Sequence, residues 1–321
     1  MAHGKRFDVV CVGIIVNDIL ARGVRKEMLD RDDATVESIH MCAGGDALNQ
    51  AVICAKLGLR SALAGKVGDD AFGKSVLRDV TEQGVHTEGI CIGQNCRTAV
   101  SIVLIQEKGS RAILSTTGTN IDTLSLDDLD FSYFRSADIV SIGSLFAIPG
   151  LNAAAVQKIY QAAKESGAIS VADACLPNTE GISLERVAPY INGLDYFVPS
   201  YSEAKVMTGE SDPEKTARLL LHYVNQAVIV KLGAEGCLVC THEETFRVPA
   251  FPAEVVDTTG AGDNFVAGFI WGLSQKLPLK ECCRLASAVG SLSTTKVGAN
   301  IAIESADQVW NYLKKIEEGG V

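Results

Sequence analysis

A glycine-rich segment near the C-terminus holds the residues that are best suited to chemistry. In EVVDTTGAGDNFVAGFIWGL, which begins at Glu254, the small residues Gly260, Ala261 and Gly262 precede Asp263. Short side chains let backbone N–H groups approach an anion at the positive end of a helix dipole. Such a nest stabilises charge on a transferring phosphoryl group. Asp263 is then suited to accept a proton from an attacking hydroxyl, and a plain helix N-cap is the structural alternative.

A second glycine-rich segment carries polar residues that suit a polyol. Gly44 and Gly45 open the helical segment AGGDALNQAVICAKLG, and Asn49 lies one turn further on. The amide of Asn49 offers donors and an acceptor to sugar hydroxyls. Asp18, just after the first expected strand, could accept from two neighbouring hydroxyls. A capping turn at the glycines and a solvated loop at Asp18 are the structural alternatives.

The segment VGDDAFGKSV, residues 67–76, matches the P-loop pattern G-x-x-x-x-G-K-[ST]. In a P-loop, Lys74 would lie in the first turn of a helix that follows the phosphate-binding bend. Here Asp69 or Asp70 is a strong N-cap, which places Gly73 and Lys74 inside the helix. An aspartate cap also occupies the N–H groups that would otherwise hold phosphate. The residues therefore favour an ordinary amphipathic helix, with a P-loop as the alternative.

Short apolar runs alternate with amphipathic segments along most of the chain. Strands are expected at residues 9–16, 61–67, 139–143, 169–173, 196–199 and 227–232, and a short one ending at Asp257. Helices are expected at residues 46–57, 151–166, 213–224, 264–275, 279–296 and 306–317. This alternation predicts a largely parallel sheet with helices on both faces. Because no repeat or linker interrupts it, residues 1–321 are expected to form a single domain.

Two segments break the alternation. Residues 98–114 predict two strands joined by a turn at residues 107–110, without a helix between them. Residues 19–41 have little helical periodicity, and their ESIHM has strand character. Together, approximately residues 17–42 and 97–116 predict a small sheet inserted in the α/β core. It would form either a lid over the carboxyl ends of the strands, where ligands of such folds bind, or an edge extension of the main sheet.

Composition excludes several classes of protein. The chain has 321 residues, of which 47% are hydrophobic, and a net charge of −10. This charge argues against nucleic-acid and anionic-membrane partners, although a local nest of N–H groups can still hold ATP. A cytoplasmic location is expected because no signal peptide or membrane span is recognisable, and ten cysteines then indicate reduced thiols.

One cysteine pair has a spacing that could suit zinc or redox chemistry. Cys237 and Cys240 precede His242, but in a strand the two thiols would point to opposite faces. Buried strand thiols are therefore favoured, and Cys282 and Cys283 are interpreted in the same way on a helix.

Together these segments resemble the ribokinase-like (PfkB) carbohydrate kinases. GGDALNQAVICAKLG is similar to the family's N-terminal motif and DTTGAGDNFVAGF to its C-terminal motif, while VGDDAFGKSV resembles a family segment that is not a phosphate loop. The resemblance runs from the first strand to KVGAN. It implies a three-layer α/β/α fold with a small β lid that often mediates dimerisation, so a homodimer is expected. It also implies an ATP-dependent sugar kinase that uses Mg²⁺ and, in several members, a monovalent cation such as K⁺.

The resemblance assigns roles by position. It implies a catalytic group made of the base Asp263 and an anion hole at Gly260, Ala261 and Gly262. It implies a sugar-binding group made of Asp18, Gly44, Gly45 and Asn49. For the nucleotide it implies Lys231, Gly233 and Gly236 of KLGAEG, with Gly298 in a nearby loop. For cations it implies Glu203 of PSYSEAKVMTG, acting indirectly on Mg²⁺, and Asp257 at a monovalent site.

Three positions depart from the family pattern and leave the acceptor open. Ser200 stands where the N-x-x-E asparagine is expected, so the outer shell of Mg²⁺ can differ. Val16 stands where ribokinases proper usually place a sugar-contacting asparagine, and Ser144 where they commonly carry a glutamate. Fructose, another ketose, a sugar acid or a nucleoside therefore stay open as acceptors. A nucleoside kinase and a catalytically silent sensor are the alternative functions; Asp263 argues against the sensor, and the 6% aromatic content argues against a nucleobase slot.

Overall fold

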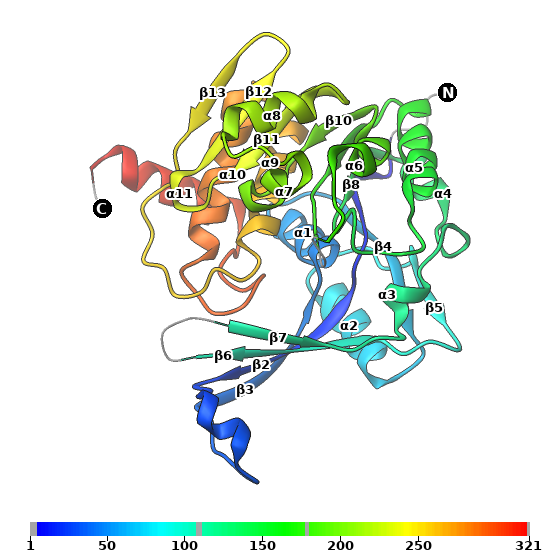
Figure 1. Ribbon diagram of the computed structural model, residues 1–321, viewed down its shortest axis with the longest axis vertical. Helices are drawn as coiled ribbons and strands as arrows, with labels where there is room; N and C mark the ends of the chain where they lie inside the picture. The colour runs from blue at the N-terminus through cyan, green and yellow to red at the C-terminus, as the bar shows by residue number, and fades with distance from the viewer. Residues whose placement is uncertain (1–4, 107–110, 177–179, 320–321) are drawn as a thin grey trace.

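A nine-stranded sheet forms the centre of the computed structural model, which describes residues 5–106, 111–176 and 180–319 (Figure 1). Its strands are β1 (Phe7–Val12), β4 (Ser61–Gly68), β5 (Ile90–Gly93), β8 (Ala137–Ile142), β9 (Ile169–Ala172), β10 (Leu194–Phe197), β11 (Val224–Lys231), β12 (Cys237–Thr241) and β13 (Thr245–Val248). The strand order is β13-β12-β11-β10-β9-β8-β1-β4-β5. All neighbours from β11 to β5 pair in parallel, whereas β12 and β13 form an antiparallel edge.

Helices cover both faces of this sheet. One layer contains α1 (Asp46–Lys56), α2 (Ala71–Glu82), α9 (Ala261–Ser274), α10 (Leu279–Ser293) and α11 (Ala306–Glu317). The other contains α4 (Phe131–Arg135), α5 (Ala153–Glu165), α6 (Leu184–Ile191), α7 (Tyr201–Thr208) and α8 (Pro213–Leu221). Short segments α3 (Asn120–Thr123), η1 (Lys26–Asp30), η2 (Leu126–Asp128) and η3 (Gly233–Glu235) complete the described helices. The predicted three-layer α/β/α architecture is confirmed.

The two helical layers enclose separate hydrophobic cores because successive strand residues face opposite sides of the sheet. In β1, Val9 packs into the core with α1 and α9, and Val10 packs into the core with α4 and α5. The same alternation places Cys237 in the first core and Cys240 in the second. These two thiols therefore lie on opposite faces of β12, as the strand interpretation predicted. No helix in the described part of the chain has the length and apolar character that a membrane span requires.

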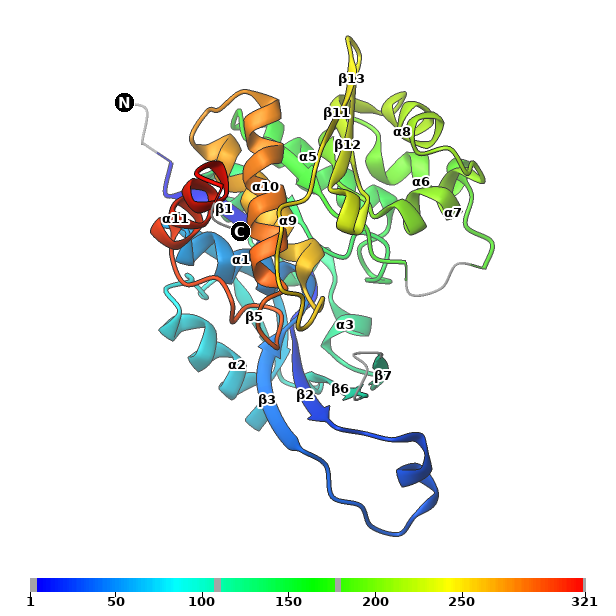
Figure 2. The same cartoon turned by 90° about the vertical axis from the view of Figure 1, so that its left-hand side faces the viewer.

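A small sheet stands apart from the central one. It comprises β2 (Val16–Arg22), β3 (Ser38–Gly44), β6 (Ala99–Ile105) and β7 (Arg111–Ser115), in the order β3-β2-β6-β7. It extends away from the helical layers, as Figure 2 shows for β2 and β3. The extended segments thus form a second sheet, and the alternative of an edge extension is wrong. The turn predicted at residues 107–110 lies outside the described residues.

Three element predictions need correction. The apolar run 9–16 is not one strand, because the chain bends after β1 at Gly13 and enters the small sheet at Val16. The strand predicted to end at Asp257 is absent, since residues 249–255 have no regular structure and the N–H groups of Val256 and Asp257 donate instead to the carbonyl of Thr294. Helix α9 begins at Ala261 rather than near Asp263.

Residues 67–76 match the P-loop pattern but do not form a P-loop in the structure. Asp70 caps α2 by accepting from the N–H of Gly73 at 2.8 Å, and it also accepts from the N–H of Thr98 at 2.7 Å. Lys74 therefore lies within the helix. Its side chain is 71% exposed and pairs with Asp69 at 2.9 Å.

Replacing Lys74 with alanine should consequently leave nucleotide binding intact. An exposed ion pair of this kind contributes no more than about 1 kcal/mol to stability. We expect the affinity for ATP, measured by calorimetry, to stay at the wild-type value in Lys74→Ala. A large loss of ATP affinity in a folded variant would restore the P-loop interpretation.

Candidate active site

Asp263 lies in the first turn of α9 and faces α1. The amide nitrogen of Asn49 donates to Oδ2 of Asp263 at 2.8 Å, across 214 residues of sequence. The orientation of the Asn49 amide is fixed in turn, because Asn300 donates to its Oδ1 at 3.1 Å. The N-cap position belongs to Gly260 and not to Asp263, so the capping alternative for this aspartate is wrong.

The glycine turn before α9 has the backbone geometry that was expected of an anion-binding nest. Gly260 has a φ of 71°, and a Cβ at this position would lie 2.8 Å from Cα of Ala299. Both features require glycine. The N–H of Ala261 donates to the carbonyl of Thr258 at a long 3.2 Å. Helix geometry directs the following N–H groups, including that of Gly262, out of the N-terminus of α9.

Asp263 has other carboxylates as neighbours. The side chain is only 7% exposed, and burial together with the carboxylates of Asp46 and Asp173 raises its pKa well above the ordinary value. The hydrogen bond from Asn49 and the charge of Lys231 oppose this shift. A carboxylate with a raised pKa is a stronger base than an ordinary one, which suits proton abstraction.

The predicted sugar-binding group comes together beside Asp263. A side chain at Gly44 would collide with the carboxylate of Asp18, so glycine here lets this carboxylate lie against the backbone. Gly45, with a φ of 104°, turns the chain into α1. Burial and the nearby charge of Asp46 raise the pKa of Asp18 to about 6. Ser144 donates its hydroxyl to Asp46, which fixes this second carboxylate at the same place.

Lys231 is the last residue of β11. It lies beside this cluster, next to the other predicted nucleotide residues of KLGAEG. Its Nζ lies 2.7 and 2.8 Å from the two carboxylate oxygens of Asp173. Glu203, the predicted magnesium residue, lies in the first turn of α7. Its Oε2 accepts from both the N–H and the hydroxyl of Ser200. Ser200, which departs from the family pattern, therefore acts as the helix cap that orients Glu203.

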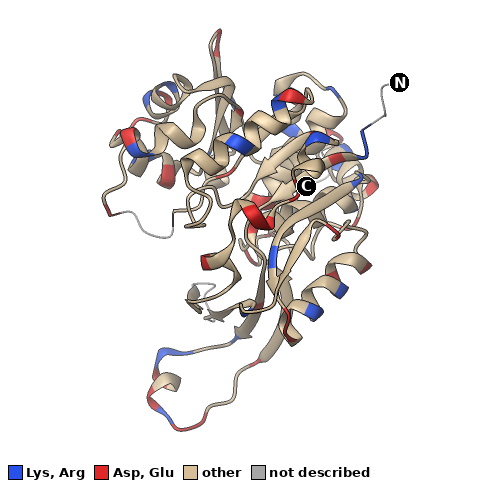
Figure 3. Cartoon of the chain, turned by 90° about the vertical axis from the view of Figure 1, so that its right-hand side faces the viewer, with Lys and Arg blue, Asp and Glu red and all other residues tan. Residues whose placement is uncertain are grey.

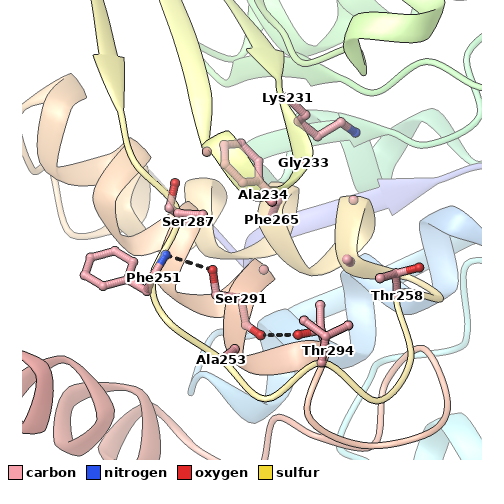
Figure 4. A pocket seen from close by; sticks show the side chains of 16 residues that line it. Lys231, Gly233, Ala234, Phe251, Ala253, Thr258, Phe265, Ser287, Ser291 and Thr294 are labelled. Carbon is pink, nitrogen blue, oxygen red and sulfur yellow. Dashed lines mark hydrogen bonds between the residues drawn. The ribbon is translucent and has the colours of Figure 1, made fainter. Parts of the chain in front are cut away.

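A cavity of about 360 Å³ adjoins the glycine turn (Figure 4). Gly233, Gly236 and Lys231 line it on one side, and Phe265 and Gly262 of α9 on the other. A side chain at Gly236 would collide with the backbone at the end of β13, so only glycine lets this turn pack so closely. The structure thus brings the predicted nucleotide residues of KLGAEG to the same cavity as the glycine turn.

The opposite wall of the cavity belongs to α10 and the loop before α9. Phe251 and Ser291 lie here, and the N–H of Phe251 donates to the hydroxyl of Ser291 at 3.1 Å, which is drawn as a dashed line in Figure 4. The hydroxyl of Ser287 also lines the cavity, is buried, and has no hydrogen-bond partner among the described residues. An unsatisfied buried hydroxyl at a cavity wall is a candidate contact for a ligand.

Asp257 and Gly298 lie together but outside this cavity lining. Oδ1 of Asp257 accepts from the N–H and hydroxyl of Thr259 at 2.9 and 2.7 Å, and Oδ2 accepts from the N–H of Gly298 at 2.9 Å. Gly298 is therefore held against Asp257 instead of forming part of the pocket wall.

Sequence reasoning missed two carboxylates of this cluster, Asp46 and Asp173. Asp173 ends an expected buried strand and Asp46 opens an expected helix. An acidic residue at the carboxyl edge of a parallel sheet is a recognisable signal, but its partner across the sheet is set by the fold. Within the described ranges, no group of three or more His, Cys, Asp or Glu side chains has a geometry that would hold a metal.

Comparison with known proteins agrees with the fold and with the glycine-rich motifs. Residues 6–306 match the model of the pfkB family of carbohydrate kinases. A probable fructokinase-5 of Arabidopsis thaliana is 30% identical over 285 residues, which cover 84% of this chain and 88% of the relative.

Solved structures share the architecture over the whole molecule. Arabidopsis thaliana ribokinase, solved with ribose and ATP, aligns with a TM-score of 0.81 and 26% identity over 97% of this chain and 99% of that one. An E. coli protein solved with ATP and Mg²⁺ aligns with a TM-score of 0.81 over 98% of this chain and 100% of that one; at 21% identity it supports the fold alone. The chain therefore belongs to the pfkB family of carbohydrate kinases, ATP-dependent phosphotransferases with a ribokinase-like fold.

Proposed function

We propose that this chain is an ATP-dependent sugar kinase in which Asp263 activates the acceptor hydroxyl. The observation that carries the proposal is the position of Asp263 between two sets of groups. On one side lie the glycine turn and the cavity lined by Gly233 and Gly236. On the other lie Asn49 and the carboxylate of Asp18. A base at this border is adjacent to both substrates of a phosphoryl transfer.

The cavity suits the nucleotide. Its walls are small or apolar, and the unpaired hydroxyl of Ser287 offers a hydrogen bond to a base ring. The two glycines of KLGAEG let the ligand approach backbone at the end toward Lys231. Gly298, through its bond to Asp257, would hold the loop beside this end rather than contact the nucleotide directly.

Glu203 and Asp257 are the residues proposed for cations. Magnesium needs only one or two carboxylates in addition to water and phosphate oxygens, and when bound it would neutralise phosphate charge. Glu203 fits because its charge acts on Lys231 and Asp173 at the edge of the cavity. Asp257 would support a monovalent cation such as K⁺; activity that is equal in K⁺ and in a bulky organic cation would exclude that site.

The transfer step follows from these positions. The acceptor oxygen forms a bond to the γ-phosphorus while the bond from this phosphorus to the β–γ bridging oxygen breaks, which releases ADP. Asp263 takes the hydroxyl proton, and the amides at Gly260, Ala261 and Gly262 stabilise charge on the phosphoryl oxygens. Asp18 and Asn49 orient the sugar through its other hydroxyls.

The charge of the acceptor side narrows the substrate class. The carboxylate of Asp46 lies within electrostatic reach of both Asp18 and Asp263. Like charges in a desolvated site disfavour an anionic ligand, so sugar acids and sugar phosphates are poor candidates. An uncharged sugar fits, and the plant relative's name makes fructose the first to test.

A coupled ADP-release assay against uncharged sugars, sugar acids and nucleosides tests this proposal. We expect turnover with at least one uncharged sugar. Turnover confined to nucleosides would favour a nucleoside kinase, and binding without turnover of any compound would favour a sensor; either result contradicts the proposal.

Replacing Asp263 with asparagine should separate catalysis from stability. Loss of the base should lower kcat by a factor of about 10² to 10⁴ while ATP still binds. The folded pKa of Asp263 is raised, so its contribution to stability is lost as pH rises through that pKa, and an uncharged amide at this position does not undergo this loss. We therefore expect Asp263→Asn to melt at a higher temperature than the wild type. A kcat close to the wild-type value would refute the assignment of the base.

The pH profile gives a second test of the base. The groups that face Asp263 are Asp46, Asp173, Lys231 and Asn49. Asp46→Asn removes a negative neighbour, so it should lower the pKa of Asp263 and move the acid limb of kcat/KM to lower pH. Asp307→Asn, an exposed carboxylate of α11, is the control and should leave the limb in place. An acid limb that does not move in Asp46→Asn would contradict the proposed electrostatic coupling.

We also propose that the small sheet is a lid whose outer face forms a homodimer. The face with Asp18 turns toward the site, and the opposite face carries a row of paired apolar residues, Met41, Ile19, Ile102 and Leu114. Ile39, Met41 and Leu114 are 65%, 54% and 57% exposed. Strands β3 and β6 contain no Lys, Arg, Asp or Glu, and Figure 3 shows charged residues in the loop that extends beyond this sheet. Such an exposed apolar face supports self-association.

Charges on this face should dissociate the dimer. We expect light scattering to report a dimer for the wild type and a monomer for the double variant Ile39→Glu, Met41→Glu. Ile113→Glu is the matched control, because Ile113 is 53% exposed on the opposite face and should leave the dimer intact. A monomeric wild type would contradict the proposal.

A further inference from the structure

Lys231 occupies the border between the nucleotide cavity and the acidic cluster. A Cβ built on Gly262 would lie 3.2 Å from Nζ of Lys231, so the ammonium lies directly against the backbone of the glycine turn. The same lysine lines the cavity with Gly233 and also a neighbouring pocket with Ser200. Figure 4 shows its side chain among those that line the cavity. The cation is thus next to the proposed anion hole and not at the distant end of the cavity.

The surroundings of this ammonium are strongly acidic. Both oxygens of Asp173 contact it, and the side chains of Lys231 and Asp173 are only 13% and 6% exposed. Burial alone lowers the pKa of Lys231, but Asp173, Glu203 and Asp263 reverse the effect and raise it. Its positive charge in turn favours the ionised forms of Asp46, Asp173 and Asp263. Lys231 therefore carries its proton throughout the range in which an enzyme works.

A buried ion pair of this kind needs an explanation beyond stability. Removing two charges from water is costly, and a well-packed apolar pair is often as stable. Here the ammonium lies against Gly262, and both residues line the cavity. A cation held ready at this point can interact with an anion that reaches the glycine turn, without any reorganisation of the protein.

We propose that Lys231 is a catalytic residue that contacts the transferring γ-phosphoryl group, and that Asp173 is a positioning residue that holds the ammonium against Gly262. The inference rests on the proposed function and makes the nucleotide assignment of Lys231 specific to one phosphate. Lys231 faces Asp263, and the base must lie beside the acceptor oxygen, so the cation lies beside the same phosphorus. As the acceptor oxygen bonds to phosphorus and the bridging oxygen leaves with ADP, Lys231 keeps its protons and donates hydrogen bonds to phosphoryl oxygens. Asp263 alone takes the acceptor proton.

Affinities for two nucleotides test this contact independently of turnover. ADP lacks the γ-phosphate, and a non-hydrolysable ATP analogue with a β–γ imido link has it. By calorimetry, Lys231→Met should bind ADP as the wild type does and should bind the analogue about tenfold or more weakly. Its kcat should fall by about 100-fold or more. Lys74→Met is the matched control and should match the wild type in all three measurements.

The positioning role of Asp173 has its own readout. Asp173→Asn keeps a hydrogen-bond acceptor for the ammonium but removes the charge. We expect kcat to fall and the preference for the analogue over ADP to shrink, with the affinity for ADP unchanged. A merely structural pair would instead lower the melting temperature and leave that preference as it is in the wild type.

Two results would overturn the proposal. Equal losses of ADP and analogue affinity in Lys231→Met would place the lysine on the α- or β-phosphate. Unchanged analogue affinity and kcat would make the pair structural. If Lys231→Met does not fold, Lys231→Gln, which can still donate to Asp173, replaces it, and the same comparison decides. Because binding is measured without a sugar, the proposed function can fail in the acceptor panel while this comparison still gives an answer.

Discussion

The site depends on a concentration of negative charge around one cation. Asp46, Asp173 and Asp263 are mutually repulsive in a partly desolvated cleft, and Lys231 is the positive charge that acts on all three. Such a cluster is unfavourable for folding, and carboxylates with raised pKa values in a cleft are candidates for a functional site. The same repulsion would strengthen Asp263 in its proposed role as a base. It would also favour the binding of neutral polyols and of phosphate groups complexed with a metal ion. It would disfavour the binding of anions that carry no metal ion.

The scaffold makes this concentration of charge possible by gathering distant segments at one sheet edge. Parallel strands end on the same side, so Asp173 after β9 and Lys231 at the end of β11 lie together. Glycines allow close approach because they have no side chain. Asp18 lies against the backbone of Gly44, and Lys231 lies against that of Gly262. Two helix N-termini, those of α1 and α9, meet through the bond from Asn49 to Asp263. Each of these segments alone provides only a part of the charged site.

Local patterns were sufficient for the architecture and for the motif residues. The layers, the expected helices and the grouping of Asp263 with Asn49 follow from periodicity, glycine turns and family resemblance. What failed depends on tertiary contacts. The apolar run 9–16 divides between two sheets because of the bend at Gly13, and the residues before Asp257 bond to the end of α10 instead of to a strand. The place of Asp46 and Asp173 in the site depends on contacts with neighbours more than 50 residues away, such as Ser144 and Lys231.

The most direct measurement is a crystal structure of the protein with its sugar, ADP and a metal-fluoride mimic of the γ-phosphoryl group. The account predicts the reactive sugar hydroxyl within hydrogen-bond distance of the Asp263 carboxylate, with the fluoride against the amides at Gly260 to Gly262 and the Lys231 ammonium. A mimic bound elsewhere, or a sugar hydroxyl out of reach of Asp263, would contradict it.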